Sequence, residues 1–182
     1  MHDIKLEEEI LSLFNNEKTK KEGFTLLVNH FKKPIYFQIR RIVLSHENTD
    51  DVVQEVFIKC WNKLNTFNGK SKLSTWIYRV AYNEAIQWIR KNKKEHHLNI
   101  TEIQTNNQPT NNIFHKDADE IIILLEKAIL KLPEKQKMIF QLKYFEDLSY
   151  KDIQIITGGS IGGLKANYHH AVIKIEKLLT ND

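Results

Sequence analysis

Apolar residues along this chain recur at steps of three and four, and no stretch alternates between apolar and polar with period two. This spacing places the apolar side chains on one face of a helix, so it predicts an all-α protein built from amphipathic helices. The apolar stripes lie within residues 24–43, 53–64, 73–88, 122–132, 138–145, 153–156 and 161–178.

A polar stretch around Pro109 divides the helical pattern. Residues 96–119 contain five asparagines and no sustained apolar period, which is typical of a linker. We therefore expect two small helical domains, residues 1–95 and 120–182, joined by this flexible linker. The sequence leaves open whether its first 19 residues pack on the first domain.

Local capping signals predict where helices of the first domain begin. Asn48 and the three residues after it suit a helix start, and a further helix is expected to open near Ser71 or Ser74. Pro34 is expected to start a new turn or to kink its helix. The buried face of the helix after Asn48 is expected to hold Val53, Val56, Phe57, Cys60, Trp61 and Leu64.

A short helix, a glycine turn and a longer helix are predicted near the end of the chain. Ser149 and Asp152 form an acidic capping box at the start of the short helix. Gly158 and Gly159 end it, and Ser160 is positioned to cap the last helix. This order is the pattern of a helix-turn-helix, which places its second helix in a DNA major groove.

The charge is concentrated in one block. The chain carries a net charge of +4, whereas residues 20–95 alone hold 15 lysines and arginines against 7 acids. A basic block of this kind favours a phosphate backbone as partner. No apolar run approaches the roughly 20 residues that span a bilayer, and the acidic N-terminus is unlike a signal peptide. We expect a cytoplasmic protein without direct membrane insertion.

Catalytic and cofactor chemistry has little support in the sequence. Cys60 is the single cysteine, so it forms no internal disulfide, and we interpret it as a packing residue. Asp51 and Glu55 lack a further ligand at metal-binding spacing. His169 and His170 are adjacent on a helix, where neighbouring side chains diverge by about 100 degrees. We expect no enzyme activity, no metal, no cofactor and no small-molecule substrate.

Three stretches, in order, carry a family resemblance. They are DDVVQEVFIKCW at residues 50–61, FNGKSKLSTWIYRVAYN at residues 67–83, and LPEKQ, YFEDLSY and SIGGLKANYHHA within residues 132–171. They resemble regions 2.2, 2.3 to 2.4, and 4 of the extracytoplasmic function sigma factors. The resemblance implies an alternative sigma factor that binds core RNA polymerase through its beta-prime clamp helices and beta flap and directs initiation at promoter DNA. It also implies control by an anti-sigma factor.

The resemblance assigns roles to three groups of residues. The face expected to bind core polymerase comprises Asp50, Asp51, Gln54, Glu55 and Ile58, of which the last four lie at helical steps of three and four. The minus-ten contacts, which include a loop that holds a flipped base in the family, comprise Phe67, Asn68, Ser71, Arg79, Tyr82, Asn83, Arg90, Lys91, Lys93 and Lys94. The minus-thirty-five contacts comprise Ser160, Gly162, Gly163, Lys165, Ala166, His169 and His170.

Some positions depart from the family pattern or allow another interpretation. The family usually has a bulkier residue at the position of Gly163 and an arginine at that of His170. The lysines of residues 91–94 also fit a solvated helix end, and the acids near Asp51 fit a solvated helix start. A different class of protein also stays open, a helix-turn-helix regulator that binds DNA without polymerase. In that case residues 20–95 would form a ligand-binding or dimerisation domain.

Overall fold

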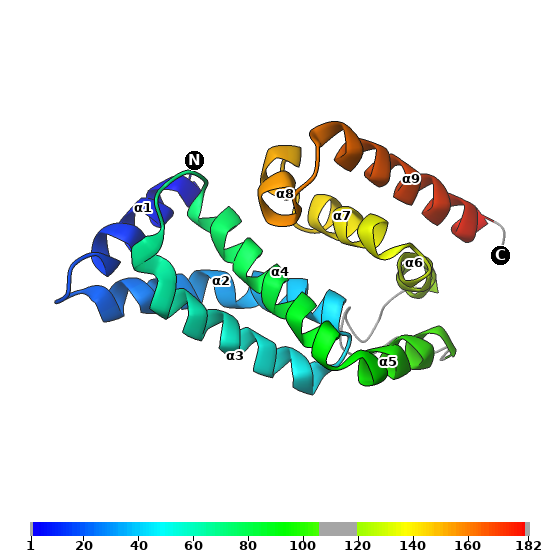
Figure 1. Ribbon diagram of the computed structural model, residues 1–182, viewed down its shortest axis with the longest axis horizontal. Helices are drawn as coiled ribbons and strands as arrows, with labels where there is room; N and C mark the ends of the chain where they lie inside the picture. The colour runs from blue at the N-terminus through cyan, green and yellow to red at the C-terminus, as the bar shows by residue number, and fades with distance from the viewer. Residues whose placement is uncertain (1, 106–119, 181–182) are drawn as a thin grey trace.

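The computed structural model describes residues 2–105 and 120–180, and all regular structure within these ranges is helical (Figure 1). The prediction of an all-α fold is therefore confirmed. The helices are α1 (His2–Phe14), α2 (Lys20–Val43), α3 (His46–Lys63), the 3-10 turn η1 (Leu64–Thr66), α4 (Leu73–Lys91), α5 (Lys93–Thr105), α6 (Glu120–Leu130), α7 (Glu134–Tyr144), α8 (Tyr150–Thr157) and α9 (Ile161–Thr180).

Helices α1 to α4 form the first domain around one apolar core. Each helix contributes residues from its apolar stripe, spaced by three or four, so burial of that stripe is what holds the helices together. The cysteine thiol lies fully inside this core, and burial raises its pKa to about 12, which keeps it protonated and unreactive. The fully buried side chains include Ile10, Leu27, Ile35, Ile39, Val43, Val56, Cys60, Leu73 and Ile77.

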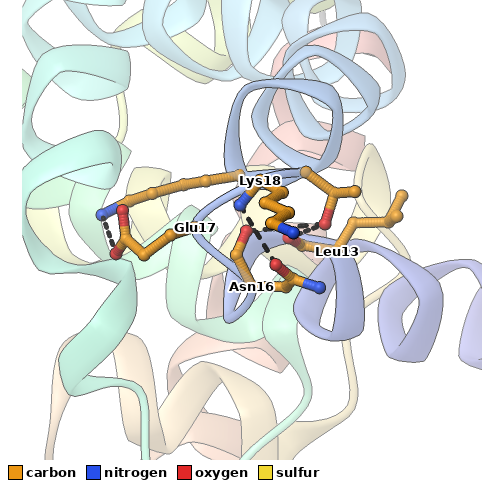
Figure 2. A network of polar contacts seen from close by, with 6 residues as sticks. Leu13, Asn16, Glu17 and Lys18 are labelled. Carbon is orange, nitrogen blue, oxygen red and sulfur yellow. Dashed lines mark hydrogen bonds and ion pairs between the residues drawn. The ribbon is translucent and has the colours of Figure 1, made fainter.

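Helix α1 is an integral part of the first domain. Ile10 and Phe14 lie in the core, and Phe14 contacts the rings of Phe24 and Trp61. The turn into α2 is held by polar contacts (Figure 2), among them the Thr19 hydroxyl, which donates to the Leu13 carbonyl at 2.9 Å. The question that the sequence left open for these residues is thereby answered.

The close approach of α1 and α2 depends on Gly23. A Cβ atom at this position would lie 2.6 Å from the Phe14 backbone nitrogen and 3.0 Å from the Ile10 carbonyl oxygen. We therefore expect Gly23→Ala to destabilise the protein by about 2 kcal/mol through overpacking. Urea unfolding measures the loss, and Gly162→Ala, at a position with open space around it, is the matched control. A Gly23→Ala protein as stable as the wild type would contradict this packing.

Helices α6 to α9 form the second domain with two small clusters of buried residues. One lies between α6, α7 and α9 and includes Ala128, Phe140 and Ala171. The other lies beneath the α8–α9 unit and includes Ile153 and Leu164. Helices α8 and α9, with the turn between them, are the predicted helix-turn-helix, and Figure 1 shows α8 at one end of the domain with α9 running from it along α7.

Several local predictions need correction. The cap of α3 is Ser45, whose hydroxyl accepts from the Asn48 backbone, so the helix begins before the predicted capping cluster. Trp61 is 36% exposed at the rim of the core instead of buried. No new helix starts at Pro34, because α2 continues through it, and α5 makes residues 96–105 of the expected linker helical. The rest of that linker lies outside the described residues.

Candidate nucleic-acid interface

One exposed face of α3 carries all five residues predicted to bind core polymerase. The side chains of Asp51, Gln54 and Glu55 are exposed, and Ile58 keeps 52% of its surface accessible. Asp50 is also exposed and pairs with the His46 imidazole one turn earlier, at 3.2 Å. The opposite face of α3 packs in the core, so the fold leaves this mixed acidic and apolar surface available to a partner.

The loop before α4 is anchored at both ends. Phe67 is half-buried with its ring 6.0 Å from that of Trp76, and Leu73 at the start of α4 is buried in the core. Between them, the Asn68 side chain accepts from the Lys70 backbone at 3.2 Å, and Gly69 has a positive φ of 69°. The loop therefore has a defined shape with exposed polar groups. Trp76 and Trp88 both pack against the core, as expected.

Helix α4 carries an exposed basic face beyond this loop. Arg79, Asn83 and Arg90 are all exposed. Asn83 lies ten residues after Leu73, about 15 Å further along the helix axis, and Trp76, on which the Phe67 ring packs, lies between them in the sequence.

The basic run after Arg90 spans a helix junction. Helix α4 ends at Lys91, Asn92 caps it, and α5 begins at Lys93. Arg90 and Lys91 lie in the last turn of α4, where cations also interact favourably with the helix dipole. These side chains and Lys94 are exposed, so a structural role and phosphate binding are both compatible with their positions.

The predicted minus-thirty-five residues lie together on the exposed N-terminal half of α9. The Ser160 hydroxyl accepts from the Gly163 backbone at 3.1 Å, which confirms the predicted cap. A Cβ atom at Gly163 would lie 3.2 Å from that hydroxyl oxygen, so the glycine leaves room for the cap. The residues of the group are exposed without exception: Ser160, Gly162, Gly163, Lys165, Ala166, His169 and His170.

The two domains contact each other through α4 and α8. The Thr75 hydroxyl of α4 donates to the Asp152 carboxylate of α8 at 2.8 Å. Arg41 of α2 forms a largely buried ion pair with Glu146, and its guanidinium carbon lies 4.3 Å from the centre of the Phe145 ring. These polar contacts accompany the apolar packing between the two domains.

Tyr82 is the one predicted minus-ten residue, among those that the structure describes, whose side chain lies in this domain contact. Together with Tyr78 it packs against the buried cluster beneath α8 and α9. Burial raises the pKa of the Tyr82 hydroxyl above its ordinary value, with a smaller contribution from Glu134. The position of this side chain thus depends on the second domain as well as on α4.

His96 of α5 is a second polar group at the domain contact that sequence reasoning did not single out. It is 8% exposed, and its Nε2 lies 2.9 Å from the Ile42 carbonyl oxygen. Burial lowers the pKa of the imidazole below its ordinary value, so the ring is neutral near pH 7. Only the fold reveals this contact, because the partner lies 54 positions away in the sequence.

The described residues contain no group of three or more His, Cys, Asp or Glu side chains arranged to hold a metal ion. Over the same ranges, no helix has both the length and the apolar character that crossing a membrane requires.

Comparison with known proteins agrees with this arrangement. Residues 27–95 match the family model of sigma-70 region 2, and residues 122–175 match that of sigma-70, region 4. The chain is 28% identical over 172 residues to the ECF RNA polymerase sigma factor SigW of Bacillus subtilis, and the alignment covers 90% of this chain and 92% of the relative.

Two solved structures share the fold. The sigma factor RpoE in complex with the anti-sigma factor NepR, from Bartonella quintana, gives a TM-score of 0.69 at 21% identity and covers 88% of this chain and 99% of that one. CnrH in complex with the cytosolic domain of CnrY also gives a TM-score of 0.69, at 18% identity, and covers 99% of this chain and 98% of that one.

The match to region 2 in the first domain and to region 4 in the second defines a protein of the promoter-recognition class. The chain belongs to the sigma-70 family of RNA polymerase sigma factors, and within it to the extracytoplasmic function type. The match over residues 27–95 contradicts the alternative in which these residues form the ligand-binding or dimerisation domain of a simple regulator.

Proposed function

We propose that this sigma factor uses three separate surfaces to start transcription. The exposed α3 face around Asp51 and Glu55 docks on the beta-prime clamp helices of core polymerase. The loop at residues 67–71 and the exposed face of α4 bind and open the minus-ten element. The N-terminal half of α9 reads the minus-thirty-five duplex in its major groove. The protein itself catalyses no reaction and needs no cofactor.

The observation that carries this proposal is the α3 face. Three exposed polar side chains and the 52% exposed Ile58 share one side of a helix whose other side is buried. A large exposed aliphatic side chain among carboxylates suits a protein interface, where apolar contact gives affinity and charge gives specificity. The solvated helix start that the sequence allowed explains the acids but not Ile58.

Promoter opening in this proposal is driven by binding energy. Unstacking a base from the duplex costs a few kcal/mol of free energy. Stacking on Phe67 and hydrogen bonds to Asn68 and Ser71 offset part of this cost. The basic side chains of residues 90–94 add phosphate contacts that carry affinity but little sequence information.

An anti-sigma factor is part of the proposal. Two structures that share this fold contain partner chains, NepR in one and the cytosolic domain of CnrY in the other, and NepR is described as an anti-sigma factor. We propose that a partner of this kind masks the surfaces above, and that the protein acts in the cytoplasm, where polymerase and promoters are found.

A reconstituted run-off assay tests the function directly. The purified protein is mixed with core RNA polymerase and a library of promoter fragments, and the transcripts are sequenced. We expect transcripts from a defined subset of promoters only when the protein is present. Tight duplex binding without polymerase association, and without such transcripts, would overturn the proposal.

A further inference from the structure

Helix α4 begins on a carboxylate that comes from α1. The Leu73 backbone nitrogen donates to Glu7 Oε2 at 2.8 Å, and the Ser74 backbone nitrogen donates to Glu7 Oε1 at 3.0 Å. One side chain thus satisfies two of the backbone donors that the start of a helix leaves without an intrahelical partner. Its negative charge also suits the positive end of the helix dipole.

The local sequence offers α4 no cap of its own. Lys72 occupies the N-cap position and makes no side-chain capping hydrogen bond, and the first turn of α4 contains no acidic residue. Lysine is a poor N-cap because its side chain carries donors only, while the N-cap position requires an acceptor. Glu7 therefore supplies what residues 71–74 lack.

The carboxylate is held by a rigid helix. Ile10 and Phe14 lie three and seven residues after Glu7, so the three side chains share the face of α1 that packs on the domain. Ile10 is fully buried, Phe14 is 3% exposed, and Gly23 lets α2 approach α1 closely. The backbone that carries Glu7 is therefore held in place beside the start of α4.

We infer that Glu7 is a positioning residue for minus-ten recognition: it fixes where α4 starts and thereby the shape of the loop that precedes it. This inference rests on the proposed role of residues 67–71 in binding the minus-ten element. The loop has two anchors, the contact of Phe67 with Trp76 and the capped start of α4. Loss of the second anchor frees the exposed side chain of Asn68 and the half-buried side chain of Ser71. Residues 27–95 match region 2, so α1 lies outside the matched segment.

The test compares Glu7→Ala with Glu8→Ala, a change of the same size at an exposed position of the same helix. Both proteins are assayed at a temperature well below their unfolding midpoints. We expect amide hydrogen exchange at Leu73 and Ser74 to speed up about tenfold in Glu7→Ala only, as expected for the loss of a helix cap.

The functional readout is discrimination between promoters. Run-off transcription is measured on a cognate promoter and on variants with single substitutions in the minus-ten element, with polymerase association measured in parallel. We expect Glu7→Ala to lower the ratio of cognate to substituted transcripts about tenfold, with polymerase association within about twofold of the wild type. Adding Lys72→Asn, whose side-chain oxygen is placed to accept from the Ser74 or Thr75 backbone, is expected to restore exchange protection at Ser74 and the transcript ratio, while the Leu73 amide stays fast.

The outcomes separate positioning from stability alone. Faster exchange at Leu73 and Ser74 with an unchanged transcript ratio would make Glu7 a structural cap only and overturn the inference. Unchanged exchange would show that the cap does not form and would overturn it as well. Asn68→Ala distinguishes failure of the proposed function: if this variant also leaves the ratio unchanged, the loop does not read the minus-ten element, and the inference fails with that role.

Discussion

Reversing two charges on α3, with Asp51→Arg and Glu55→Arg, is expected to weaken binding to core RNA polymerase at least about 100-fold, because like charges brought together at an interface cost several kcal/mol. Both side chains are exposed, so the thermal unfolding midpoint should stay within about 2 °C of the wild type. Binding is measured by fluorescence anisotropy of labelled protein titrated with core polymerase.

The matched control reverses two other exposed acids, with Glu8→Arg and Glu9→Arg on α1. The net charge changes by the same amount, so a general loss of electrostatic attraction would appear in both proteins. Equal binding by the α3 variant and this control would remove the proposed docking face. Loss of binding in the α3 variant alone would support it.

Replacing Phe67 and Asn83 together by alanine is expected to reduce promoter opening about tenfold to 100-fold, because each base stacked on an aromatic ring contributes about 1–3 kcal/mol. Permanganate reactivity of unpaired thymines measures opening, and gel filtration with core polymerase measures assembly. We expect opening to fall much more than assembly, because neither residue lies on the α3 face.

Phe67→Ala also removes the ring contact with Trp76, and loss of one ring from such a pair lowers the stability of the protein by about 1 kcal/mol. Opening is therefore compared at equal folded fraction, and the single variant Asn83→Ala, at an exposed position, serves as a reference without that contact. Opening at the wild-type level in the double variant would argue against the proposed minus-ten contacts.

Sequence reasoning succeeded where the physical cause is local. Ser149 and Ser160 cap helices whose first turns follow them directly, and the hydroxyl of each accepts a backbone hydrogen bond from three residues later. The apolar stripes likewise predicted the helices and most of the core, because a stripe at steps of three and four must be buried wherever the helix packs.

The missed features depend on contacts between distant parts of the chain. Glu7 caps a helix that begins 66 residues later, and no pattern around Glu7 indicates that partner. Trp61 was predicted to be buried because its position continues the stripe of α3, yet the core ends beside it. Residues 96–105 of α5 were assigned to the linker because they are polar, and helices without a clear apolar face are the hardest to recognise from sequence.

The contact between α4 and α8 divides the proposed minus-ten residues of α4 into two groups. Thr75, Tyr78 and Tyr82 follow one another at steps of three and four, and this side of α4 meets the second domain, whereas Arg79 and Asn83 point to solvent. Arg79 and Asn83 are therefore accessible while the two domains are in contact, whereas Tyr82 is partly covered by the second domain. On the proposed role of Tyr82 in minus-ten binding, we expect separation of the domains to precede that contact.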